Sequence, residues 1–117
     1  MHSEQMSPDM KTCVDACLSA YSMCEETINH CLQQGGEYLD PALMRTLMDC
    51  ADMTRMCADM CMRMSPMSKD ICVMCAQACD MAAEACMRMK NDPQMEQCGQ
   101  ACRACAESCR SMSGIRA

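Results

Sequence analysis

The chain has 117 residues and a formal net charge of −6, and its length predicts a single domain. It contains 15 Cys and 18 Met but no Phe or Trp and only two Tyr. With ten Lys and Arg in total, it lacks the basic and aromatic surface that nucleic-acid binding requires. Cysteine and methionine must therefore supply the core, since both are soft side chains that pack well when buried.

The chain also lacks the signals of a membrane protein. No run approaches 18 apolar residues, and the opening MHSEQMSPDMKTC has no apolar signal-peptide segment. An odd number of cysteines cannot pair completely within one chain, and reduced thiols suit the cytoplasm. We therefore expect a soluble cytoplasmic protein with no membrane partner, or an exported one if a leader has been removed.

The N-terminal third predicts a short arm followed by one helix. Residues 1–7 are expected to form a polar, flexible arm, and Ser7-Pro8 then provides an N-cap followed by proline at the first helical position. The helix is expected over residues 8–34 and ends at Gly35-Gly36. At about 100° per residue, its four cysteines fall within a stripe about 40° wide. These cysteines are Cys13, Cys17, Cys24 and Cys31.

Three further helices follow the same pattern. They are expected over residues 40–64 after Asp40-Pro41, 66–90 after Ser65-Pro66, and 93–113 after Asn91-Asp92-Pro93. Residues 114–117 are expected to form a C-terminal tail. Each helix again carries its cysteines on one face: Cys50, Cys57 and Cys61 in the second, Cys72, Cys75, Cys79 and Cys86 in the third, and Cys98, Cys102, Cys105 and Cys109 in the fourth.

Short connections between these helices favour antiparallel neighbours. The predicted fold is therefore all-α, an antiparallel up-down-up-down four-helix bundle over residues 8–113 with a cysteine-lined core. No strand pattern competes with it.

The spacing of the cysteines indicates metal ligands. Residues three or four apart on a helix have Cβ atoms about 5–6 Å apart, whereas a disulfide needs about 3.5–4.5 Å. Five C-x3-C pairs are expected to nucleate metal binding, and Cys24, Cys31, Cys50, Cys72 and Cys86 to join across helices. The pairs are Cys13/Cys17, Cys57/Cys61, Cys75/Cys79, Cys98/Cys102 and Cys105/Cys109.

Charge balance in a buried thiol core favours Cu(I) as the bound metal. Several ions are expected, approaching one ion per cysteine. A monovalent ion that replaces one proton per sulfur keeps the core neutral, and thiolates and thioethers select Cu(I). A zinc-thiolate buffer is an alternative, but four thiolates around Zn²⁺ leave a net charge of −2. An iron–sulfur or thiol-redox protein is a second alternative, but the sequence lacks the cysteine-bearing loops of iron–sulfur sites and the βαβ pattern of thiol-redox proteins. The third alternative is a helical interaction module whose cysteines bind no metal.

The cysteine pattern of residues 8–113 resembles that of the bacterial copper storage proteins. The resemblance rests on C-x3-C pairs in all four helices, on His30-Cys31, Gly35-Gly36 and Asp49-Cys50-Ala51, and on the CxxCAxxC spacing of Cys72–Cys79 and Cys102–Cys109. It implies a four-helix bundle that stores Cu(I) on cysteine thiolates without catalysis, and assembly as a homotetramer.

Methionines and one histidine gather where the helices end. Antiparallel packing brings His30, Met44 and Met95 to the same end of the bundle. Thioethers bind Cu(I) without losing a proton. The resemblance implies that metal is admitted through an open end lined by methionine and histidine, so these three side chains are candidate ligands that aid copper uptake. Packing at the core edges and between subunits is the alternative role for the methionines.

Overall fold

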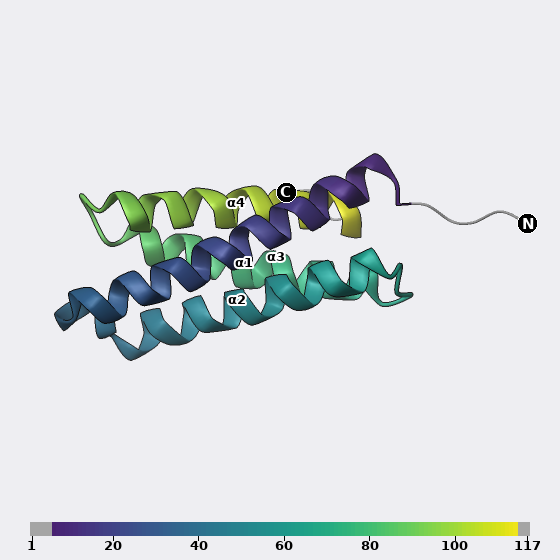
Figure 1. Ribbon diagram of the computed structural model, residues 1–117. Coiled ribbons are helices and arrows are strands. Elements are labelled where there is room, and N and C mark those ends of the chain that lie inside the picture. Colours follow the sequence, from purple (N-terminus) through teal and green to yellow (C-terminus); the bar gives the residue numbers. More distant parts are fainter. Residues whose placement is uncertain (1–5, 115–117) are drawn as a thin grey trace, which may run out of the picture.

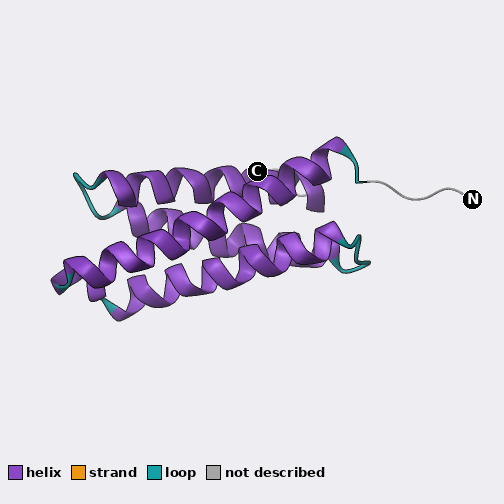
Figure 2. Ribbon diagram, viewed as in Figure 1, coloured by secondary structure: helices purple, strands orange, loops and turns teal. Residues whose placement is uncertain are grey.

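Four long helices form the protein. The computed structural model describes residues 6–114. It contains α1 (Pro8–Gln34), the short 3-10 helix η1 (Gly36–Leu39), α2 (Pro41–Met62), α3 (Ser68–Met87) and α4 (Pro93–Ser113). Successive helices run antiparallel, and α4 packs against both α3 and α1 (Figure 1). Residues 6–114 contain no strand (Figure 2), so the predicted all-α up-down-up-down bundle is confirmed.

Three helices begin with a capping side chain followed by proline. The Ser7 hydroxyl accepts a hydrogen bond from the Met10 amide at 3.1 Å, and the Asp40 carboxylate accepts one from the Leu43 amide at 3.0 Å. The Asp92 carboxylate does the same for the Met95 amide at 3.1 Å. These contacts satisfy amides that have no partner inside the helix, so the cap-plus-proline pairs fix where α1, α2 and α4 start.

The helix α2 ends at Met62, two residues before the predicted residue 64. Met64 adopts a left-handed conformation with φ of 54°. The Ser65 amide then donates to the Met60 carbonyl at 3.0 Å, and the Met64 amide donates to the Cys61 carbonyl at 3.1 Å. This pair of bonds is a Schellman motif, which usually places glycine at the left-handed position. The methionine at this position explains why the sequence pattern placed the end too late.

The helix α3 is shorter than the predicted range 66–90 at both ends. Pro66 and Met67 precede it in a turn, in which the Ser68 hydroxyl donates to the Ser65 carbonyl at 2.7 Å. Residues 88–92 form a second turn, and Asn91 in that turn has φ of 62°. Asparagine tolerates this left-handed conformation better than other residues with a side chain, and the reversal brings the chain into α4.

The core consists almost entirely of cysteine and alanine. All fifteen cysteines are fully buried, and Leu47 and Met95 are the largest completely buried side chains. Two threonines, Thr27 and Thr54, are also fully buried, and Thr54 donates to the Cys50 carbonyl at 2.7 Å. Small side chains allow four helices to approach closely, so the sulfur atoms occupy the centre of the bundle.

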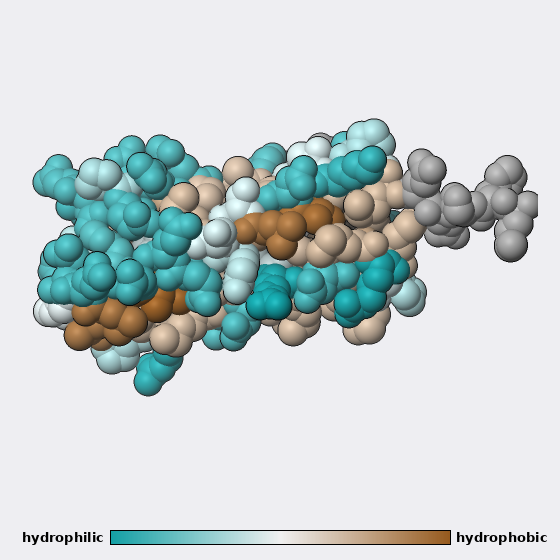
Figure 3. Space-filling view, viewed as in Figure 1, coloured by the Kyte–Doolittle hydropathy of each residue, from teal (hydrophilic) through white to brown (hydrophobic). Residues whose placement is uncertain are grey.

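The outer surface is mainly polar with separate apolar areas. Figure 3 shows this for the face on which α1 lies. The exposed large apolar side chains on α1 and η1 are Leu18, Leu32 and Leu39. None of the helices in residues 6–114 is both long enough and apolar enough to cross a lipid bilayer.

The left-handed conformation of Asn91 predicts a specific stability pattern. Asn91→Ala is expected to lower the free energy of unfolding of the reduced protein by about 1 kcal/mol, because alanine pays the full steric penalty at positive φ. Asn91→Gly should leave it nearly unchanged. Asn29→Ala, at an exposed position inside α1, is the matched control and should not destabilise. Chemical denaturation measures all three, and an equal response at both asparagines would contradict the assignment.

Candidate functional site

The candidate site is the column of thiols along the axis of the bundle. All fifteen cysteines are free thiols with no exposed surface. Each helix contributes its cysteines at spacings of three, four or seven residues, which place them on one face of the helix. Four such faces meet at the axis, so the sequence pattern of each helix becomes one wall of a continuous sulfur-lined interior.

Three groups of thiols lie close enough to share metal ions. Within each group, all sulfur atoms lie within 4.8 Å of one another. The first group takes one cysteine from each of the four helices. The second draws on three helices and shares one cysteine with the first, and the third lies between α1 and α4. The groups are Cys13, Cys57, Cys72 and Cys109; Cys17, Cys75, Cys105 and Cys109; and Cys24, Cys98 and Cys102.

Most of the closest sulfur pairs join different helices. The distance between sulfur atoms is 3.5 Å for Cys17 and Cys105, and 3.7 Å for Cys24 and Cys102. Cys50 bridges two helices, since its sulfur lies 3.7 Å from that of Cys79 and 3.8 Å from that of Cys102. The sulfur atoms therefore form a nearly continuous path along the core.

The thiol groups do not simply follow the C-x3-C pairs within single helices. Two C-x3-C pairs, Cys98/Cys102 and Cys105/Cys109, each fall within one group. Cys13 and Cys17 belong to different groups, because each meets its own set of partners from the other helices. Cross-helix contacts thus organise the thiols, and Cys24, Cys50 and Cys72 have the cross-helix neighbours that the sequence suggested.

These distances suit ions that bridge two sulfurs. A metal–thiolate bond is about 2.3 Å long, so one ion can span two sulfurs up to about 4.6 Å apart. A disulfide, by contrast, requires sulfurs about 2.05 Å apart. Pairs at 3.5–4.0 Å, such as Cys17/Cys105 and Cys57/Cys72, are therefore spaced for a metal between them.

Two thiols at the His30 end of the column have raised pKa values. Burial, followed by the negative charge of Asp92, raises the pKa of Cys31. Hydrogen bonding with Cys98, followed by burial, raises the pKa of Cys86. A buried thiolate without a counter-ion is unfavourable because the interior solvates charge poorly. Metal binding must therefore displace protons.

His30 is held by two neighbours at one end of the column. Its Nε2 lies 2.8 Å from the Asp92 carboxylate, which also accepts a hydrogen bond of 2.7 Å from the Tyr38 hydroxyl. Desolvation acts to raise the pKa of Asp92, but the hydrogen bonds from His30, Tyr38 and the Met95 amide outweigh it and lower the pKa to about 2. Asp92 therefore ties together the end of α1, η1 and the start of α4.

Met95 closes this end of the sulfur column. It has no exposed surface, and its sulfur lies 4.0 Å from that of Cys31. Met44 is partly buried and packs against the core. The His30 side chain is 24% exposed. The three residues named for copper uptake thus lie at different depths: His30 and Met44 near the surface, and Met95 inside.

Sequence reasoning placed all fifteen thiols on the inner faces of the helices, where they are buried, but missed what holds His30. From the sequence, Asp92 could be recognised only as a helix cap. Its second carboxylate oxygen contacts His30 and Tyr38, which lie 62 and 54 residues away along the chain. The short segment from Gly36 to Leu39 brings Tyr38 to this point. No local sequence signal marks such a contact.

Comparison with known proteins identifies one family. A family model described as "Copper storage protein" matches residues 6–114. None of the curated proteins matches the sequence at a significant level.

Several solved structures have the same fold. A crystal structure of a Nitrosospira multiformis protein is 34% identical with a TM-score of 0.85, covering 92% of this chain and 97% of that one. Apo copper storage protein 3 from Bacillus subtilis is 30% identical with a TM-score of 0.78, covering 88% and 97%. The Cu(I)-bound copper storage protein BsCsp3 is 28% identical with a TM-score of 0.84, covering 90% and 98%.

The Asp92 contacts predict a pH-dependent contribution to stability. Asp92→Asn should lower the free energy of unfolding at neutral pH by about 2 kcal/mol. This is the free energy that corresponds to lowering the pKa from 3.8 to about 2. Because the folded-state pKa is below the unfolded value of 3.8, this contribution is present above about pH 4 and is lost as the pH falls toward 2. Denaturation at several pH values measures it.

Asp40→Asn is the control, since Asp40 caps α2 in the same way and asparagine caps equally well. It should change stability little at any of these pH values. Equal losses in the two variants would show that capping, rather than the His30 and Tyr38 contacts, accounts for the role of Asp92.

Proposed function

Because the chain belongs to the copper storage protein family, we propose that it stores Cu(I) by exchanging the protons of its core thiols for copper ions. One observation carries the proposal: Cys13, Cys57, Cys72 and Cys109, one from each helix, have sulfur atoms within 4.8 Å of one another in a fully buried core. Such a set binds soft metal ions and excludes water and oxidants. The family is one of storage proteins, and no reaction is assigned to these thiols.

Charge balance favours Cu(I) over the alternatives. Each Cu(I) that replaces one thiol proton leaves the core neutral, whereas each Zn²⁺ bound by four thiolates leaves a charge of −2 in a dry interior. The thiols also lie on helices rather than on the loops typical of iron–sulfur sites. Zinc buffering and redox chemistry are therefore less well supported than copper storage.

The proposed ligands are all fifteen cysteines, and the proposed capacity approaches one Cu(I) per cysteine. Support comes from the shared neighbours in the column. Cys109 belongs to two groups, and Cys50 contacts sulfurs on two other helices. When each thiolate bridges two ions and each ion is bound by two thiolates, the number of ions equals the number of sulfurs.

The proposed route of copper into the core lies at the end that carries His30. His30 and Met44 are partly exposed there, and the sulfur of the buried Met95 lies 4.0 Å from that of the first thiol, Cys31. On this route an ion that reaches Cys31 passes Met95, whose side chain must move. A flexible thioether suits this step, because it binds Cu(I) without deprotonation and returns to apolar packing afterwards.

The proposed assembly is a homotetramer in the cytoplasm. The family resemblance supports the tetramer, and exposed apolar side chains such as Leu18 and Leu32 provide surface that association would bury. A reducing compartment supports the location, because it keeps fifteen buried thiols in the form that binds metal.

Anaerobic titration of the reduced protein tests copper storage. We expect a thiolate-to-copper absorbance that grows until nearly 15 Cu(I) ions are bound per chain. About one proton should be released per ion, measured with a pH indicator in weak buffer. Saturation at one or two ions, or release of several protons per metal ion with a preference for Zn²⁺, would contradict the proposal.

Substitutions at the His30 end test the route of uptake. Replacing His30, Met44 and Met95 together by Leu should slow loading from a Cu(I) chelate by about tenfold, a barrier increase of about 1.4 kcal/mol. The final capacity should not change, since no cysteine is altered. The matched control replaces Met62, Met67 and Met112, near the opposite end, by Leu. Equal loading rates in both variants would rule out this route.

A further inference from the structure

The outside of the bundle carries a methionine-lined groove between α2 and α3. The groove has a volume of about 280 Å³, and its large apolar lining residues are all methionines: Met53, Met56, Met74 and Met81. Met56, Met74 and Met81 are each about half exposed, at 49%, 55% and 53%. Thioethers as exposed as these three are not needed to fill the core, whereas Met53 is partly buried and packs against it.

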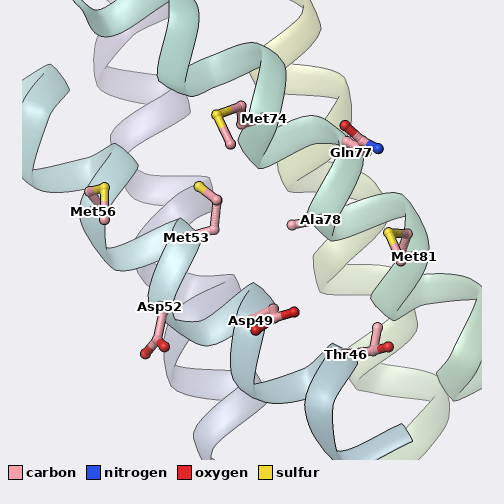
Figure 4. Close-up of a pocket in the computed structure, with 9 residues that line it drawn as sticks. All are labelled: Thr46, Asp49, Asp52, Met53, Met56, Met74, Gln77, Ala78 and Met81. Atoms are coloured by element: carbon pink, nitrogen blue, oxygen red, sulfur yellow. The ribbon is translucent and has the colours of Figure 1, made fainter. Parts of the chain in front are cut away.

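Two of these methionines face each other. In Figure 4, Met53 on α2 and Met74 on α3 point toward one another across the groove, and Met56 lies further along α2. Met81 lies further along α3. Thioether sulfurs that face each other from two helices can serve as donors for a soft monovalent metal ion, because thioethers are neutral ligands that select Cu(I).

The charges around the groove suit a cation better than an apolar protein surface. Asp49 and Asp52 both line the groove and are exposed. Their negative charge attracts a metal ion and partly balances it. Charged residues are depleted from the centres of protein interfaces, where desolvating them is costly, so these carboxylates oppose the burial of the groove against another copy of the chain.

The groove also lies directly outside the thiol core. Met56 and Met74 are adjacent in sequence to the core ligands Cys57 and Cys75. Behind the same pair of helices, the sulfurs of Cys50 and Cys79 are 3.7 Å apart. The small side chain of Ala78 lines the groove between the two helices.

We propose that Met53, Met56 and Met74 form a Cu(I) site on the outside of the bundle, separate from the cysteine core and from the His30 end. The proposal rests on the proposed function only for the identity of the metal. The ion binds to neutral sulfur atoms, so no proton leaves the protein and no redox change takes place. The site holds copper more weakly than the core does, because thioethers carry no charge. It therefore fills after the thiols.

The test uses full-length protein labelled with ¹³C at the methionine methyl groups and first loaded until the thiolate-to-copper absorbance stops rising. Further Cu(I), supplied as its acetonitrile complex without oxygen, should shift the methyl resonances of Met53, Met56 and Met74. About one more ion per chain should bind, without proton release. This distinguishes the outer site from the core, which releases protons as it fills.

The variant Met53→Leu/Met56→Leu/Met74→Leu should lose the additional ion and keep the capacity of the core. Leucine preserves the apolar volume of the groove, so an interface between chains would survive this change while a metal site would not. The control replaces Met48, Met62 and Met67, which are exposed outside the groove, by Leu and should retain the ion.

Two results would overturn the proposal. One is that the three methyl resonances do not respond to excess Cu(I), or that the triple variant binds the additional ion as well as the native chain does. The other is that these resonances change with protein concentration in the absence of copper, which would make the groove a contact between copies. Either result leaves the copper capacity of the cysteine core as a separate measurement, so failure here is distinguishable from failure of the proposed storage function.

Discussion

The structure depends on keeping fifteen sulfur atoms electrically neutral in a dry interior. A single unpaired charge in such an environment costs several kcal/mol, and many thiolates at separations near 4 Å would repel one another strongly. The metal-free protein therefore holds protonated thiols, and uptake must exchange protons for metal ions of equal charge. This constraint explains why the column suits a monovalent soft ion and why storage in it is coupled to pH.

A core made of cysteine and alanine has consequences for stability. These side chains bury less apolar surface than leucine or phenylalanine, so the hydrophobic contribution per helix is small. Contacts at the ends of the helices then matter more. Ser7, Asp40 and Asp92 each cap a helix, and Asp92 also binds His30 and Tyr38. The end contacts hold the helices in register, and the register determines which thiols meet.

The fold could be predicted from the sequence because its signals are local. Cap-plus-proline pairs mark where three of the helices start, and the cysteine spacing shows which face of each helix is buried. The thiol groups could not be predicted, because they depend on the axial position of one helix relative to another. That position is set by turns such as the one at Met64, where an unusual left-handed methionine ends α2. The membership of each thiol group therefore depends more on the loops between helices than on the C-x3-C spacing within one helix.

The two kinds of sulfur in this protein differ in how they respond to protons, and their positions follow that difference. Thiols need a dry interior to resist oxidation and bind copper only after losing a proton, so they occupy the core. Thioethers lose no proton when they bind copper, and the chain places several of them at the surface, Met56 and Met74 among others. A copper ion bound first by such a thioether would require no proton transfer. Its move to a buried thiol would gain a charged ligand, and this free-energy difference between neutral and charged sulfur would favour inward transfer.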